Sequence, residues 1–323
     1  MNDLKTKVLY FAKNNQIGMA LLISLMMFMV NITLNPSSLN VNAIGSIITL
    51  TVILVIASAG QTLVIISDGI DMSVGATMTL TAIVTTSIMK TQEAPILFVY
   101  ALIASLAIGA LVGLLNGIGS AKIGLPPLIV TLSISNVVTR MQYVYTGGKP
   151  TGRASAWFTQ SVTHRYFGFL PSGLIYGIII FAILFYLLRY TRYGQQLFLV
   201  GNNKRAAELT GIKSTKIKVV NYMFAGMLSG FAGLIGAGYM NFVSGGAFES
   251  YTIMSIVAVV VGGTLLSGGK GSYVGTLAGA LLMVVLSNSL AVLDLSQSVK
   301  DIIMGVVLII LLAAYNREKP VRQ

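Results

Sequence analysis

Residues 43–90 read AIGSIITLTVILVIASAGQTLVIISDGIDMSVGATMTLTAIVTTSIMK and contain two apolar runs, 43–66 and 73–90, separated by a short polar link. A helix needs about 20 apolar residues to cross the hydrocarbon core of a bilayer. Both runs have about that length. The stretch therefore predicts two consecutive membrane-spanning helices, and an all-α fold for the chain that contains them.

The same criterion, applied to residues 1–323, predicts a single transmembrane domain of about ten helices. Only 9% of the residues are charged, whereas a soluble domain has about 25%. Most of the surface is thus expected to meet lipid or other helices. The first run is interpreted as a retained helix, because no small-residue cleavage site follows it. The predicted spans are 17–35, 43–66, 73–90, 95–119, 125–140, 172–189, 218–240, 252–267, 272–293 and 300–315.

The distribution of positive charge predicts the orientation of these spans. Lys and Arg in short loops remain on the cytoplasmic side. With both termini in the cytoplasm, most of the 21 Lys and Arg lie there, including those near the termini and those around segment 190–217. The net charge of +12 is therefore expected from membrane edges and predicts no nucleic-acid partner. The longest external loop, 141–171, is long enough to be partly re-entrant and holds Trp157 and His164, the one Trp and the one His of the sequence.

Motifs for catalysis are missing from the sequence. The run 262–272, GGTLLSGGKGS, differs from a phosphate-binding loop because Gly271 follows Lys270 where Ser or Thr is required. It is interpreted as a tight cytoplasmic turn. His164 has no second histidine, the acids are scattered, and the chain has no cysteine. We expect no catalytic residue, no cofactor and no metal site in this chain, and hence no enzyme.

Several polar residues are predicted at membrane depth, where they are costly and often functional. Asp71 lies in the polar link and Ser73 directly follows it, and the two either cap the helix that begins near residue 73 or serve as a gate or solute contact. Polar side chains elsewhere in the predicted spans either form hydrogen bonds between helices or line a polar path. The candidates for a solute path or gate are Asp71, Ser73, Asn116, Thr131, Ser287 and Asn288.

Glycines recur at intervals of four residues within the predicted spans. They form small faces that let helix backbones approach closely in lipid, or that let helices slide during a transport cycle. The series are Gly109, Gly113 and Gly117; Gly226 and Gly230; and Gly275 and Gly279.

The string GNNKRAAELTGI, residues 201–212, predicts a short cytoplasmic helix that begins after Asn202 or Asn203 and ends at Gly211. Four further motifs accompany it: GIDMSVG (69–75), LPPLIVTL (125–132), TGGKP (146–150) and VGGTLLSGGKGS (261–272). With these motifs the chain resembles, over nearly its whole length, the permease subunits of bacterial ABC importers for monosaccharides, the ribose, xylose, galactose and autoinducer-2 group. Members of that group commonly have uncharged residues before GIDMSVG, whereas this chain has Asp68.

The resemblance implies a multi-pass protein of the bacterial inner membrane that pairs with a second permease copy or a sister permease. It implies two further partners, a periplasmic solute-binding protein and a separate ABC ATPase subunit that holds ATP and Mg²⁺. Segment 202–212 matches the family's coupling helix, which would sit in a cleft of the ATPase. The residues implied in coupling are Asn202, Asn203, Lys204, Arg205, Ala206, Ala207, Glu208 and Gly211.

Two other functions remain open from the residues. An ion- or proton-coupled secondary transporter would use Asp71 as its coupling carboxylate. An intramembrane hydrolase or polyprenyl-group transferase would need a cluster of catalytic side chains, which the lone His164 and the scattered acids argue against.

Overall fold

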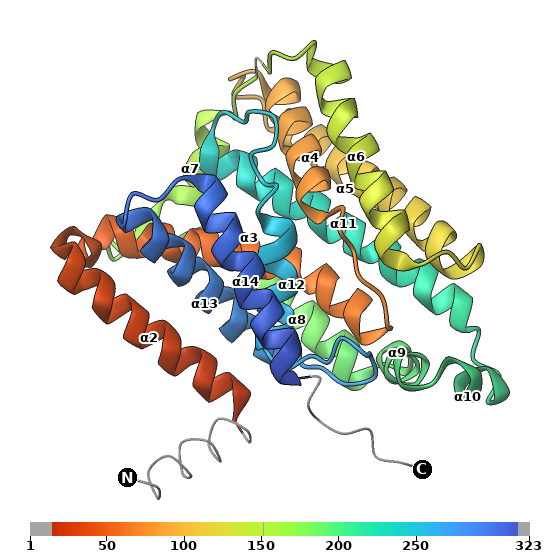
Figure 1. Cartoon of the computed structure of the whole chain (residues 1–323). Coiled ribbons are helices and arrows are strands. Elements are labelled where there is room, and N and C mark those ends of the chain that lie inside the picture. Colours follow the sequence, from red (N-terminus) through yellow and green to blue (C-terminus); the bar gives the residue numbers. More distant parts are fainter. Residues whose placement is uncertain (1–14, 151, 316–323) are drawn as a thin grey trace, which may run out of the picture.

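The computed structural model describes residues 15–150 and 152–315, and these residues form a bundle of helices (Figure 1). Each of the ten predicted spans corresponds to a helix, which confirms the all-α fold. The helices that correspond to the predicted spans are α2 (Gln16–Leu34), α3 (Val41–Ile66), α4 (Val74–Met89), α5 (Pro95–Gly117), α6 (Pro127–Thr146), α8 (Leu174–Tyr190), α11 (Ser214–Met240), α12 (Tyr251–Val261), α13 (Tyr273–Val292) and α14 (Gln297–Tyr315). The short elements are η1 (Pro36–Leu39), η2 (Ile118–Lys122), α7 (Ala156–Thr163), β1 (Arg165–Tyr166), β2 (Leu170–Pro171), α9 (Arg192–Asn202) and α10 (Lys204–Leu209).

Within the described residues, five helices are long and apolar enough to cross a membrane: α2, α3, α5 with η2, α11 and α13. The pair α8 and α9, bent by 71°, raises the number to six if it counts as one span. In contrast, α4 and α12 have only 16 and 11 residues. At about 1.5 Å per residue they rise about 24 and 16 Å, less than the hydrocarbon core of about 30 Å. The structure confirms helices at the predicted spans 73–90 and 252–267, but both helices are part-length, and α12 ends at Val261 instead of near residue 267.

The part-length helices meet at their N-termini. The Gly75 amide of α4 donates to Thr252 Oγ1 of α12 at 3.0 Å, and the Phe248 amide donates to Thr79 Oγ1 at 3.1 Å. A Cβ added at Gly75 would lie 2.4 Å from the Phe248 carbonyl oxygen. Each helix is preceded by a non-helical segment, 67–73 for α4 and 241–250 for α12. Segment 241–250 is mostly exposed or half-buried, whereas Ser67, Gly69, Asp71 and Ser73 are buried, so the irregular backbone of 67–73 lies inside the bundle. Such backbone is tolerated at membrane depth where protein surrounds it.

Glycine faces bring the helices of the core into backbone contact. A Cβ at Gly109 would lie 2.1 Å from the Gly226 carbonyl oxygen, and one at Gly113 would lie 2.0 Å from the Tyr222 carbonyl oxygen. A Cβ at Gly279 of α13 would lie 2.0 Å from a carbonyl oxygen of α12. These contacts confirm that the spaced glycines serve tight helix packing. α11, which α3, α4 and α5 surround, is the central helix of the bundle.

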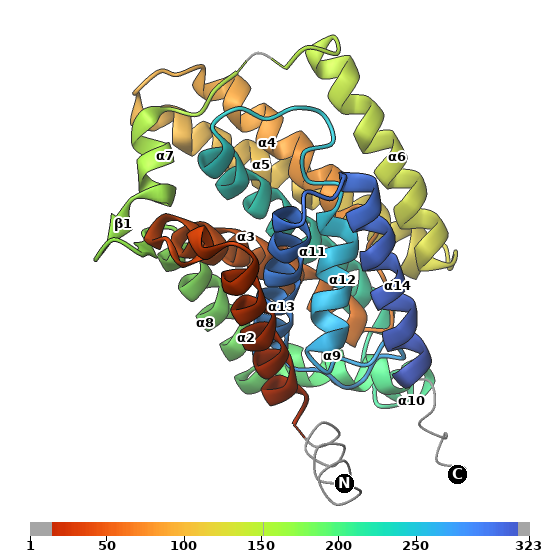
Figure 2. The same ribbon diagram turned by 60° about the vertical axis from the view of Figure 1, so that its left-hand side comes forward.

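The two ends of the bundle differ in what they carry. Figure 2 shows α9 and α10 at the end where α2 begins and α14 finishes, as the predicted cytoplasmic placement of these elements requires. The terminal cations used in that prediction lie outside the described residues. At the other end α6 continues to Thr146, beyond the predicted start of loop 141–171, and the rest of that loop contains α7 and the antiparallel pair β1 and β2. Trp157 packs edge-on against Phe98 there, and His164 is exposed.

Candidate functional site

The predicted coupling helix is α10, and local sequence signals set both of its ends. Asn203 has extended backbone, and its side-chain oxygen accepts from the Ala206 amide at 3.0 Å, which is the geometry of an N-cap. Gly211 ends the helix with a φ of +84°, a conformation that glycine adopts without strain. The helix therefore begins after Asn203 and ends before Gly211, as predicted. Asn202 is not the cap; it is the last residue of α9.

α10 exposes nearly all of its side chains. Only Ala207 is buried, whereas the side chains of Lys204 and Glu208 are 51% and 47% exposed and their charged atoms are 4.0 Å apart. Arg205 and Leu209 are also exposed. An ion pair of this exposure contributes about 0–1 kcal/mol to stability. The charges on α10 are therefore available for contact with another molecule, and the fold depends little on them.

The backbone beneath α10 is fixed to the bundle. A Cβ at Gly201 of α9 would lie 1.8 Å from the Ile66 carbonyl oxygen at the end of α3. The same carbonyl accepts from the Gly269 amide at 2.9 Å. Gly263, Gly268 and Gly269 all have positive φ, which confirms that the glycines of 262–272 build a tight turn. α9, the end of α3 and this turn thus form one packed layer at the α10 end of the molecule.

Three of the predicted path residues lie together as a buried polar cluster, which we define as Asp71, Ser73 and Asn116. Asp71 Oδ1 accepts from the Ser73 amide at 2.8 Å, the Ser73 hydroxyl at 2.7 Å and Asn116 Nδ2 at 3.3 Å. Asn116 Nδ2 also donates to Ser73 Oγ at 2.8 Å. All three residues are at most 1% exposed. α5 therefore holds the segment that leads into α4.

The prediction that Asp71 and Ser73 cap the following helix needs correction. Ser73 occupies the N-cap position of α4, but its side chain accepts no bond from the helix. Asp71 bonds the Ser73 amide, one residue before α4 begins, and the free Gly75 amide is satisfied by Thr252. Asp71 thus closes a turn ahead of the helix, and the capping oxygen comes from α12.

Thr131 of α6 extends the buried polar cluster. Its hydroxyl accepts from the Met72 amide at 3.1 Å and lies 3.4 Å from the Ile70 carbonyl oxygen. The last two predicted path residues, Ser287 and Asn288, lie elsewhere. Both are on α13 and line a separate cavity of 280 Å³ together with Tyr239 and other residues. Four of the six candidates therefore share one site and two do not.

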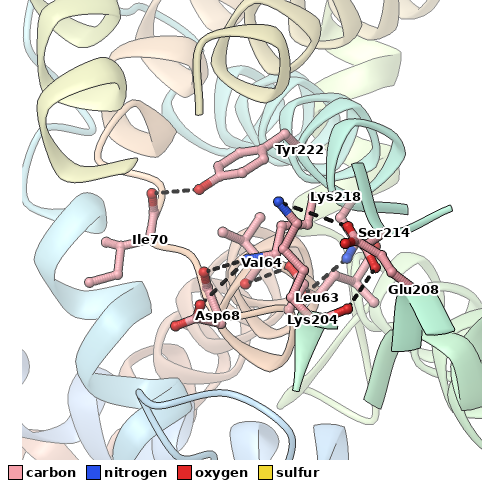
Figure 3. A network of polar contacts seen from close by, with 11 residues as sticks. Leu63, Val64, Asp68, Ile70, Lys204, Glu208, Ser214, Lys218 and Tyr222 are labelled. Carbon is pink, nitrogen blue, oxygen red and sulfur yellow. Dashed lines mark hydrogen bonds and ion pairs between the residues drawn. The ribbon is translucent and has the colours of Figure 1, made fainter. Parts of the chain in front are cut away.

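Sequence reasoning missed the contacts that hold segment 67–73 from the side of α11. Lys218 Nζ lies 3.2 Å from the Asp68 carbonyl oxygen and 3.4 Å from Asp68 Oδ2. One turn later the Tyr222 hydroxyl donates to the Ile70 carbonyl at 3.3 Å (Figure 3). The spacing of four places Lys218 and Tyr222 on one helix face. Nothing in the sequence, however, indicates that their partners lie about 150 positions away.

A cavity of 470 Å³ lies between α10 and the segment that leads to Asp71. Its wall combines the polar side chains of Asp68, Ser120, Lys204 and Lys218 with apolar residues of the η2–α6 link. It is therefore a space of mixed polar and apolar lining, bounded by Lys204 of α10 on one side and by segment 67–73 on another.

The apolar helices long enough to cross a membrane indicate a multi-pass membrane protein. The family model of the branched-chain amino acid transport system permease component matches residues 43–312. The chain belongs to this family. No solved structure was found to match it.

Several similar proteins are named as sugar import permeases. The chain is 33% identical to the ribose import permease protein of Escherichia coli over 96% of its length and 97% of that protein. It is 36% identical to the ribose import permease protein of Bacillus subtilis, over 86% of this chain and 85% of that one. It is 32% identical to the fructose import permease protein of Rhizobium meliloti, over 80% and 73%.

Proposed function

We propose that this chain is the membrane-spanning permease of an ABC importer that moves a monosaccharide or similar small polar solute into the cytoplasm. The similar permeases named for ribose and fructose import support this solute class. Membership of a permease family supports a transport subunit without catalysis of its own. The expected location is the bacterial inner membrane.

The structure of α10 is the main support for this proposal. It is short, capped at Asn203, exposed on its charged face, and joined to a packed layer of the bundle. Because the sequence has no phosphate-binding loop, ATP-driven transport would need another protein to hydrolyse the ATP, and a short rigid helix suits the transfer of that energy. We therefore assign ATP and Mg²⁺ to a partner ATPase subunit that would receive residues 202–211.

The buried polar cluster is proposed as part of the solute path or its gate. Within the described residues, Asp71 Oδ2 and Asn116 Oδ1 are buried without a hydrogen-bond partner. A buried acceptor without a donor is costly. A solute hydroxyl that reached the cluster in another conformation would satisfy these oxygens. Thr131 would belong to the same site, whereas Ser287 and Asn288 would contact solute in the separate cavity.

The remaining partners follow from this scheme. A periplasmic solute-binding protein would deliver solute at the end that carries α7. A second permease copy or a sister permease would complete the path, and lipid would cover the apolar outer surface. We propose no nucleic-acid partner.

Reconstitution tests the proposal. The chain, an ATPase subunit and a binding protein from the same genome neighbourhood are placed in liposomes, and uptake of labelled pentoses and hexoses is measured with and without internal ATP. We expect uptake that requires ATP and survives collapse of the proton gradient. Uptake that continues without ATP and stops when the gradient collapses would instead support a secondary transporter that uses Asp71.

A further inference from the structure

We propose that Lys218 is a positioning residue that transmits the movement of α10 to the segment carrying Asp71. The inference rests on the proposed function, because it assigns a role to a residue within ATP-driven transport. Lys218 itself would contact neither solute nor ATPase. It would set the position of segment 67–73, and so of the buried polar cluster.

The first link joins α10 to α11. The Ile212 amide donates to the Ala207 carbonyl at 3.1 Å, and the Ser214 hydroxyl donates to the Lys204 carbonyl at 3.4 Å. Ser214 is the first residue of α11. A displacement of α10 must therefore displace the start of α11, since the two helices are bonded across a short turn.

The second link joins α11 to segment 67–73. Ser214, Lys218 and Tyr222 follow one another at intervals of four, so they lie along one face of α11. The side chain of Lys218 is only 15% exposed, and its ammonium group reaches both the carbonyl and the carboxylate of Asp68. This face is seen in Figure 3. The ammonium group thus binds the backbone of the segment as well as a side chain.

The shape of the segment explains why these contacts matter. Asp68 has a φ of +59°, which ends α3 and turns the chain away from the helix axis. A Cβ at Gly69 would lie 2.6 Å from the Tyr222 hydroxyl, so the segment lies directly against α11. Residues 67–73 have no regular hydrogen-bond ladder of their own. Their position is consequently set by contacts to neighbouring helices, of which those of Lys218 and Tyr222 come from α11.

The third link is covalent. Ile70, whose carbonyl accepts from Tyr222, immediately precedes Asp71, which bonds Ser73 and Asn116. Contacts thus run without a gap from α10 through one face of α11 to the buried polar cluster. Among Ser214, Lys218 and Tyr222, the three residues of this α11 face, Lys218 has the charged side chain, and it bonds segment 67–73 through Asp68.

A structural role and a positioning role make different predictions for Lys218. The carboxylate of Asp68 is 61% exposed, and an ion pair with one such partner contributes little to stability. Loss of the pair should therefore leave unfolding nearly unchanged. Coupling between two sites is commonly worth a factor of about 5 to 150. Loss of a transmitting contact should thus appear in transport and not in stability.

The experiment uses the complete importer in liposomes, with solute uptake and ATP hydrolysis measured on the same preparation. In Lys218→Met we expect the ratio of solute imported to ATP hydrolysed to fall about fivefold or more. The ATPase should still co-purify, and the melting temperature should not move. The matched control is Lys216→Met, which removes an exposed lysine from the same turn of α11. Lys218→Arg keeps the charge and should restore the ratio.

A double-mutant cycle identifies the contact. Asp68→Asn should lower the ratio less than Lys218→Met, because the Asp68 carbonyl remains. The double variant should show the same ratio of solute imported to ATP hydrolysed as Lys218→Met, since both substitutions remove the same interaction between the two side chains. An unchanged ratio in Lys218→Met, an equal loss in Lys216→Met, or additive losses in the double variant would overturn the inference. If the proposed function itself is wrong, the unmodified importer will show no ATP-driven uptake, which is a separate result.

Discussion

α10 lies between α9 and α11, and segment 67–73 connects α3 to α4, yet these two linking elements are built in opposite ways. α10 exposes its charges, and its one side-chain ion pair lies within the helix. Segment 67–73 leads into a cluster at most 1% exposed, and it bonds α5, α6 and α11. The contrast separates two roles. Side chains on α10 can change without disturbing the fold, whereas the fully buried side chains that contact segment 67–73, those of Asn116, Thr131 and Tyr222, help to determine it.

We expect the largest loss of folded protein when a larger side chain is added at the buried contact between α5 and α11. Gly113 of α5 lies one turn before Asn116, and a Cβ there would lie 2.0 Å from a backbone oxygen of α11. Gly113→Leu should therefore separate the two helices, cost more than the 1–3 kcal/mol of ordinary overpacking, and yield little folded protein. Size-exclusion chromatography in detergent measures the yield.

The control for that variant adds a similar side chain to α10. Ala206 is exposed, so Ala206→Leu should give a normal yield and melting temperature. Equal losses in the two variants would remove the distinction between the two regions.

The next largest effect, a fall in melting temperature together with a loss of uptake, is expected for substitutions of Asp71. Asp71→Ala removes the acceptor of three hydrogen bonds and leaves the buried amide and hydroxyl donors of Ser73 unsatisfied, while Asn116 Nδ2 keeps only its bond to Ser73 Oγ. Each buried donor left unpaired costs about 1–3 kcal/mol, so the melting temperature should fall clearly and uptake should be lost.

Asp71→Asn sharpens this test, because an amide oxygen can still accept the bonds that Oδ1 accepts. We expect Asp71→Asn to keep most of the stability that Asp71→Ala loses. A variant with the amide that is as unstable as the alanine variant would show that the charge, and not the acceptor, holds the cluster together.

A smaller effect is expected at Tyr222. Tyr222→Phe removes one hydroxyl that donates to the Ile70 carbonyl and keeps the ring. The loss of one neutral hydrogen bond should cost about 1 kcal/mol in thermal unfolding. Tyr145→Phe, which alters a tyrosine with a largely exposed side chain at the far end of α6, should cost nothing measurable. A cost at Tyr145 equal to that at Tyr222 would contradict the assigned contact.

The sequence predicts those parts of the molecule that depend on local signals. Helix positions follow from apolar runs, and the ends of α10 follow from Asn203 and Gly211. The true length of α12 could not be predicted, because Leu265 and Leu266 extend the apolar run into a turn. The partners of Asp71 and Asp68 could not be predicted either, since Asn116 and Lys218 are 45 and 150 positions away.

The central claim is that energy enters through α10, and Arg205→Glu tests it most directly. Arg205 is exposed, so the charge reversal should leave the melting temperature unchanged. Solute uptake and ATP hydrolysis are measured together on the reconstituted importer. The account predicts folded protein whose uptake is lost or no longer follows ATP hydrolysis. Normal ATP-driven uptake by Arg205→Glu would contradict it.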